Sequence, residues 1–99
     1  MKNLKWTVTK ILLTDGIPCN TSGYWYLLEA VQRLYKSGHK GAPLMKAIYL
    51  DIAKEFGVSW NSVERVMRYS ISVANIDMNN GNYIMYSLIR VEKELEEIS

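Results

Sequence analysis

Apolar residues recur along this chain at intervals of three and four positions, which is the spacing of amphipathic helices. No segment shows the regular alternation of apolar and polar residues that indicates a β-strand. Glycines and prolines that can end helices fall at residues 16–18, 38–43, 57 and 81. The pattern therefore predicts an all-α fold, a compact bundle of about five or six helices.

We expect four of these helices near residues 4–14, 43–56, 59–74 and 83–98, and a further helix between the first of these and Gly38. Thr21 or Ser22 can cap the second helix, Gly38 can end it, and Ser59 can cap the fourth. The segment Asn79–Asn82 is predicted to be a turn-rich connector. By their spacing, the side chains that point inward from the first three helices are Leu4, Val8, Ile11, Leu12, Tyr24, Leu27, Leu28, Val31, Leu34, Tyr35, Ile48, Ile52, Ala53 and Phe56.

Residues 49–68, YLDIAKEFGVSWNSVERVMR, have the pattern of a helix-turn-helix. Such a unit needs a small residue where its helices cross, a turn residue that tolerates positive φ, and apolar contacts from both helices. Ala53 and Gly57 can supply the first two features. The apolar contacts are expected from Ile52, Phe56, Val58, Val63 and Val66. This predicts a helix-turn-helix over about Leu50–Ala74.

The helix after this turn has an apolar face and a polar face. The apolar face comprises Trp60, Val63, Val66, Met67, Ile71 and Ala74, and the candidate base-reading residues on and beside the polar face are Asn61, Ser62, Glu64, Arg65 and Arg68. In a DNA major groove, arginine can bond to guanine, glutamate can accept from cytosine, and asparagine can pair with adenine. Candidates for contact with the DNA backbone are Lys40, Lys46, Lys54, Ser59, Tyr69 and Ser72. The alternative is an ordinary solvated face with a Glu64–Arg68 pair at i, i+4 spacing.

Composition limits the other possibilities. With 99 residues, 48% hydrophobic and 22% charged, the chain can form one core, so we expect a single domain over residues 1–99. One cysteine and one histidine, Cys19 and His39, cannot build a zinc cage or a disulfide framework. We therefore expect no enzyme activity, no metal and no cofactor. Trp6, Trp25 and Trp60 lie at helical spacings that favour core or interface positions.

Charge is distributed unevenly along the chain. Residues 1–74 carry ten basic and five acidic side chains, whereas residues 75–99 carry two and five. The basic part suits a polyanionic partner. The predicted amphipathic C-terminal helix, residues 83–99, combines an apolar seam (Ile84, Leu88, Val91, Leu95, Ile98) with Glu92, Glu94, Glu96 and Glu97. We expect it to face away from DNA, packing on the first two helices or holding a second copy. No signal peptide or membrane span is apparent, which predicts a cytoplasmic protein.

Two stretches of the chain are similar to a known family of domains. The stretches GIPCNTSGYWYLLEAV and MKAIYLDIAKEFGVSWNSVERVMRYSISVANID resemble the C-terminal DNA-binding effector domain of the sporulation stage-zero master response regulator of spore-forming Firmicutes. The resemblance covers about Ile11 to Asp77. It implies an all-helical domain whose recognition helix enters the major groove, with monomers on tandem DNA boxes. It also implies that Glu64 and Arg65 read bases and that Arg68 holds a basic position of the motif.

The chain departs from that family in several ways. Ser62 stands where the family has a base-reading arginine, so the same DNA box is not expected. Leu50 replaces a proline that starts the first helix of the pair, so this helix is expected to join its predecessor. The segment after Asp77 is shorter than in the family. No phosphoacceptor receiver domain occurs in these residues, so we expect a free-standing effector domain or a fragment.

Together these observations predict a sequence-specific transcription regulator that binds double-stranded DNA. A homodimer on tandem sites is a further expectation. The alternative is an interaction module or antagonist with the same fold that binds another regulator or RNA polymerase.

Overall fold

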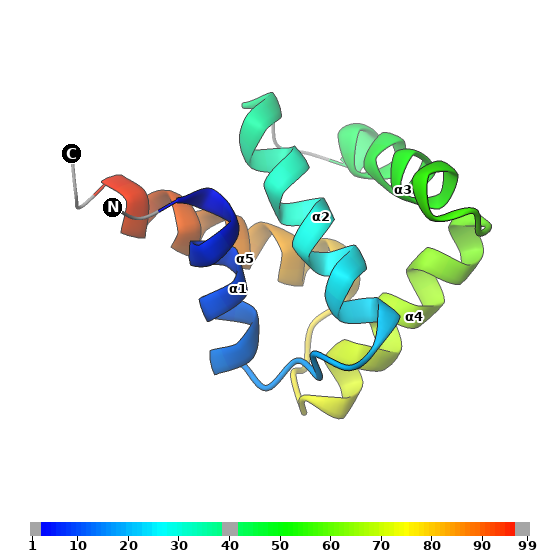
Figure 1. Ribbon diagram of the computed structural model, residues 1–99, viewed down its shortest axis with the longest axis horizontal. Coiled ribbons are helices and arrows are strands. Elements are labelled where there is room, and N and C mark those ends of the chain that lie inside the picture. Colours follow the sequence, from blue (N-terminus) through cyan, green and yellow to red (C-terminus); the bar gives the residue numbers. More distant parts are fainter. Residues whose placement is uncertain (1–2, 39–41, 97–99) are drawn as a thin grey trace.

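The computed structural model describes residues 3–38 and 42–96, and the regular structure in this part of the chain is helical (Figure 1). The helices are α1 (Leu4–Thr14), α2 (Ser22–Ser37), α3 (Ala42–Phe56), α4 (Trp60–Val73) and α5 (Asn80–Glu96). The predicted all-α bundle of about five or six helices is confirmed. His39, Lys40, Glu97 and Ile98 lie outside the described residues.

Polar side chains and a glycine set the ends of the first two helices. The side chain of Asn3 accepts a hydrogen bond from the N–H of Trp6 at 2.7 Å, which caps α1. Thr21 caps α2 in the same way, and Gly38 ends α2 with a φ of +69°. Both helices therefore have the predicted boundaries.

The C-terminal helix begins three residues earlier than predicted. The side chain of Asn79 accepts a hydrogen bond from the N–H of Asn82 at 2.8 Å, so Asn79 acts as the N-cap and Asn80–Asn82 form the first turn of α5. The prediction of a connector over Asn79–Asn82 is therefore wrong beyond its first residue. Asparagine is favoured both in turns and at N-caps, so composition alone did not separate the two.

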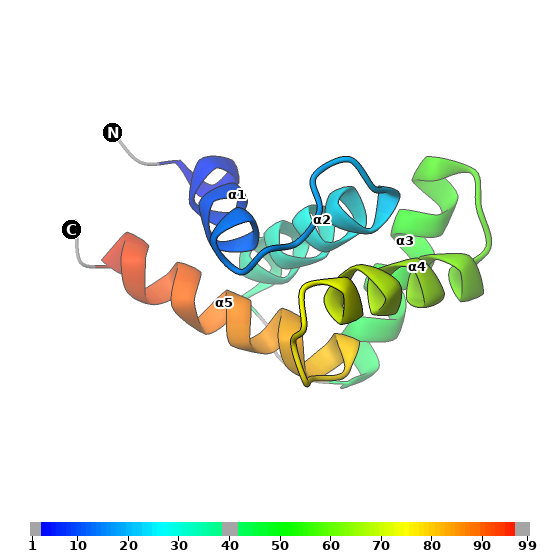
Figure 2. The ribbon, with the colours of Figure 1, turned by 90° about the horizontal axis from the view of Figure 1, so that it is seen from below.

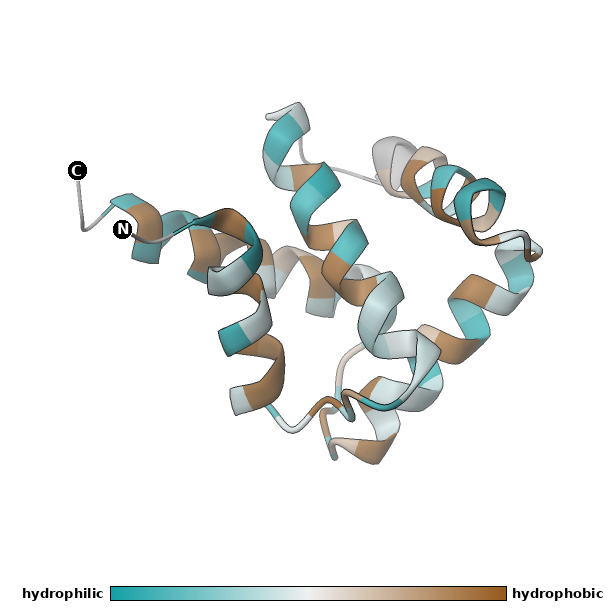
Figure 3. Cartoon of the chain, in the orientation of Figure 1, coloured by the Kyte–Doolittle hydropathy of each residue, from teal (hydrophilic) through white to brown (hydrophobic). Residues whose placement is uncertain are grey.

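Helix α2 is the centre of the bundle. It packs against α1, α3, α4 and α5, with α1 on one side of it, α3 and α4 on the other, and α5 crossing behind it (Figure 1). The start of α1 and the end of α5 lie at one end of the molecule, and the α3–α4 turn lies at the opposite end (Figure 2). Apolar and polar bands alternate along α2 and α4, as amphipathic helices require (Figure 3). The core side chains of α2 are Tyr24, Tyr26, Leu27, Leu28, Ala30, Val31 and Leu34.

Several aromatic and apolar residues predicted to occupy core or interface positions are exposed. They are Phe56 (42% exposed), Val58 (38%) and Trp60 (39%) at the α3–α4 turn, and Trp6 and Trp25 on α1 and α2. The α3–α4 turn lies at the end of the bundle (Figure 1), so a residue there can have an inward helical phase and still be exposed. Phe56 keeps one partner, the ring of Tyr26, with 5.1 Å between the ring centroids. The core predictions for Phe56, Val58 and Trp60 are therefore wrong.

Helix α5 packs within the same molecule, against α1 and α2. Tyr83, Ile84, Leu88 and Val91 are fully buried in this contact. At its edge, Arg90 makes two hydrogen bonds to Asp15, of 2.6 and 2.9 Å, and the Tyr83 hydroxyl donates a third to Asp15 at 2.7 Å. The buried residues of the apolar seam therefore pack within the molecule, which was one of the two roles expected for this helix.

Candidate nucleic-acid interface

The turn between α3 and α4 has the geometry of a helix-turn-helix. Gly57 has a φ of +69°, and the N–H of Val58 donates to the carbonyl of Ala53 at 3.0 Å, closing the end of α3. A Cβ at Gly57 would meet nothing within 4 Å, so the backbone conformation, and not lack of space, favours glycine there. Helix α3 runs through Leu50 without a break, as expected from the loss of the family proline.

Ser59 is the N-cap of α4, as predicted. Its Oγ accepts a hydrogen bond from the N–H of Ser62 at 3.1 Å and donates one to the Ser62 hydroxyl at 3.2 Å. The side chain of Ser62 is therefore part of the cap. Where the resemblance implies a base-reading arginine, this chain has a short hydroxyl held against the start of α4.

Helix α4 is held tightly against α2 at Gly23. A Cβ on Gly23 would lie 2.0 Å from the Oγ of Ser70 and 2.7 Å from the carbonyl oxygen of Val66. The hydroxyls of Thr21 and Ser70 are 3.1 Å apart and form a hydrogen bond across the same junction. Our sequence interpretation missed Gly23 and Ser70. A glycine inside a helical pattern is a signal of close packing, and it could have found this junction.

This contact orients the two faces of α4. The face against the bundle contains Val63, Met67, Ser70 and Ile71, which are buried. The opposite face exposes Asn61, Arg65, Arg68, Tyr69 and Ser72. Five of the predicted base-reading or backbone residues thus share one exposed face, with Arg65 near its middle.

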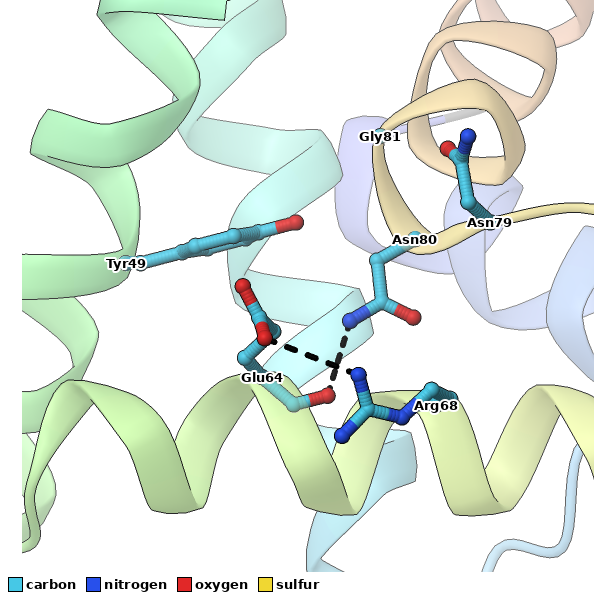
Figure 4. Close-up of a pocket in the computed structure, with 6 residues that line it drawn as sticks. All are labelled: Tyr49, Glu64, Arg68, Asn79, Asn80 and Gly81. Atoms are coloured by element: carbon cyan, nitrogen blue, oxygen red, sulfur yellow. Dashed lines mark hydrogen bonds and ion pairs between the residues drawn. The ribbon is translucent and has the colours of Figure 1, made fainter.

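Glu64 lies at the edge of this face and not within it. It is half-buried at the junction of three helices, where a pocket of about 290 Å³ is lined by Tyr49, Glu64, Arg68, Asn79, Asn80 and Gly81 (Figure 4). One guanidinium nitrogen of Arg68 is 3.6 Å from its carboxylate. The Nδ2 of Asn80 donates a hydrogen bond to the carbonyl oxygen of Glu64 at 2.8 Å. The ion pair named as the ordinary alternative is therefore present.

That ion pair leaves Arg68 available for other contacts. The Arg68 side chain is 64% exposed, and an exposed pair of this kind contributes only about 0.2–1 kcal/mol.

Burial, together with the negative charge of Glu64, raises the pKa of Tyr49 to about 12, while a hydrogen bond with Asn80 acts in the opposite direction. Tyr49 therefore stays a neutral hydroxyl beside the carboxylate at physiological pH.

The predicted backbone-contacting residues belong to both helices of the pair. Lys46 and Lys54 are exposed on α3, eight residues apart with the exposed Leu50 midway, so they share a ridge of that helix. Tyr69 and Ser72 are exposed on α4. Lys40, predicted for the same role, lies outside the described residues.

Other kinds of site find no support in the part of the chain that the structure describes. No group of three or more His, Cys, Asp or Glu side chains is arranged to hold a metal ion within residues 3–38 and 42–96. None of the helices seen there is both long and apolar enough to cross a membrane. Cys19 is an exposed free thiol in the loop between α1 and α2.

Comparison with known families agrees with the geometry of α3 and α4. The family model for the C-terminal region of the sporulation initiation factor Spo0A matches residues 8–96, which include most of α1 and all of α2 to α5. The match extends beyond the stretch on which the resemblance was based and continues after Asp77 to residue 96. This chain therefore belongs to the Spo0A C-terminal family, the DNA-binding effector domains of a sporulation response regulator.

Proposed function

We propose that this domain is a sequence-specific DNA-binding transcription regulator whose helix α4 enters the major groove. The observation that carries the proposal is the exposed face of α4, where Asn61, Arg65 and Arg68 lie on a helix whose other face is locked into the bundle. A rigidly held helix with guanidinium and amide groups on its free face can hydrogen-bond to base edges. We assign Arg65 and Glu64 to base reading. Asn61 and Arg68 would contact neighbouring bases, and the short side chain of Ser62 would contact a base only at close range.

The remaining polar and basic side chains are assigned to the DNA backbone. Such contacts orient a protein on the duplex without specifying sequence. Lys46 and Lys54 would approach phosphates beside the groove, and Ser59, Tyr69 and Ser72 would do so from α4. Binding of two copies to tandem sites belongs to the same proposal, whereas contact with another regulator or RNA polymerase belongs to the interaction-module alternative.

The experiment is selection of bound sequences from random DNA, followed by affinity measurements for Arg65→Ala and Arg65→Lys. Arg65→Ala should weaken binding to the preferred site by about 1–3 kcal/mol and binding to random DNA much less. Arg65→Lys keeps the charge but lacks the planar fork that pairs with guanine, so it should lose preference while retaining non-specific affinity.

Equal weakening on both DNAs would contradict base reading by Arg65. Failure of the selection to yield any preferred sequence would contradict the proposal as a whole. Binding to a protein regulator or polymerase with little dependence on salt, and no DNA binding, would favour the interaction-module alternative, because DNA binding releases counterions and weakens steeply with salt.

A further inference from the structure

Asn80, the first residue of α5, makes a buried contact with the middle of α4. Its residue surface is 7% exposed, and its Nδ2 donates a hydrogen bond to the carbonyl oxygen of Glu64, which is 16 residues earlier in the chain. Figure 4 shows the amide of Asn80 directed at this carbonyl from across the pocket. The start of the C-terminal helix is thereby tied to the turn of α4 that carries Glu64.

The helix itself does not need this hydrogen bond. The carbonyl of Glu64 lies inside α4, where the N–H four residues later, that of Arg68, is its regular helical partner. The other half of the amide, Oδ1 of Asn80, is buried and has no hydrogen-bond partner among the described residues. An unpaired buried oxygen opposes folding, so the amide as a whole adds little to stability. The amide ties the start of α5 to α4 at Glu64, and it also acts on the hydroxyl of Tyr49 of α3 in the same pocket.

The position of this contact matters because Glu64 is at the edge of the DNA-facing surface. Successive residues of an α-helix are separated by 100° around its axis, so a small rotation of α4 would turn the Glu64 carboxylate into the pocket or out of it. Gly23 fixes α4 on its α2 side, and Asn80 fixes it on its α5 side. We infer that Asn80 is a positioning residue that sets the orientation of Glu64 for base reading, an inference that rests on the proposed function.

The test is Asn80→Leu, which keeps approximate size and removes both amide groups. We expect a melting temperature close to that of the unsubstituted chain. Discrimination should fall by about fivefold at the base pair where Glu64→Ala loses it, with affinity for random DNA unchanged. Because Asn80 acts through Glu64, the double variant Glu64→Ala/Asn80→Leu should discriminate no worse than Glu64→Ala alone.

The neighbouring asparagine is the matched control. Asn79→Ala removes the N-cap of α5 and should lower the melting temperature without changing discrimination. Asn80→Ala serves as a second variant if leucine prevents folding.

Three outcomes would overturn the inference. Unchanged discrimination in both Asn80 variants would exclude a positioning role, and equal weakening on all DNAs would show a purely structural one. Loss of discrimination at base pairs that Glu64→Ala does not affect would show action through another residue. If the unsubstituted chain has no sequence preference, the proposed function is wrong and the positioning role falls with it.

Discussion

Gly23 fixes the separation of α2 and α4. Alanine there would place its Cβ 2.0 Å from the Ser70 hydroxyl and 2.7 Å from backbone, so one helix must move. We expect Gly23→Ala to destabilise the domain by about 1–3 kcal/mol, although alanine is the better helix former. Gly81→Ala is the control, since its Cβ would be 3.7 Å from the nearest atom, and it should be neutral or stabilising. Denaturant unfolding checks both variants, and equal stability of the two would contradict the close approach.

Asp15 links α1 to α5 through charge. Burial alone would raise the pKa of Asp15, but hydrogen bonds from Arg90 and Tyr83 and the charge of Arg90 outweigh it and lower the pKa below its ordinary 3.8. A carboxyl whose pKa is lowered by folding stabilises the native state fully above the unfolded value. This stabilisation is lost as the pH falls through the folded value.

The substitution Asp15→Asn should therefore cost about 2 kcal/mol at pH 7, where a charge-assisted contact is lost. The difference from the unsubstituted chain should shrink as the pH falls below 3.8, the ordinary value for an aspartate. Free energies of unfolding measured from pH 7 to pH 2 test this. Asp51→Asn, on the exposed side of α3, should show no comparable loss. A cost that stays constant down to pH 2 would mean that packing, and not charge, is responsible.

At the scale of elements, periodicity and caps predicted where the helices lie. The apolar spacing of α2 and α4 gave their buried faces, and Thr21, Gly38 and Ser59 marked ends that the structure confirms. Periodicity gives the phase of a residue around its helix, but it does not show how far neighbouring helices extend to cover that residue. For that reason Trp60, which has an inward phase, is exposed where the bundle ends.

The candidate site was predictable to the extent that it lies on one helix. The exposed positions of Asn61, Arg65 and Arg68 follow from the same periodicity. The contact of Asn80 with Glu64 joins residues 16 apart whose meeting depends on how α5 packs, so no local pattern shows it. Glu64 is half-buried because α5 packs beside it, so no local pattern predicts this position either.

Helix α5 is an essential part of the fold because its buried residues are large. Each fully buried side chain such as Ile84 or Leu88 contributes about 1.5–3 kcal/mol, and a small domain has only about 5–15 kcal/mol in total. A chain that ends before Asn80 should therefore fail to fold, as circular dichroism and thermal unfolding would show. A stable truncated fold that binds single DNA sites but loses cooperative binding to tandem sites would instead assign α5 to dimerisation.

At the scale of the whole molecule, the position of the acidic cluster matters for DNA binding. This cluster of glutamates is near the end of α5, where Glu94 pairs with Lys10 of α1. That end lies opposite the α3–α4 turn (Figures 1 and 2). DNA held by α3 and α4 would therefore lie far from the acidic end.

Two lysines test this arrangement under matched conditions. Lys54 and Lys93 are both exposed and both in the last turn of a helix, α3 and α5 respectively. Each change to alanine removes one positive charge and the same helix-end interaction. Lys54→Ala should lower the slope of log affinity against log salt concentration by about one, because one phosphate contact is lost, whereas Lys93→Ala should leave the slope unchanged. Equal effects would mean that DNA responds to the net charge of the domain, and a larger effect of Lys93→Ala would place DNA on the α5 side, against the role proposed for α4.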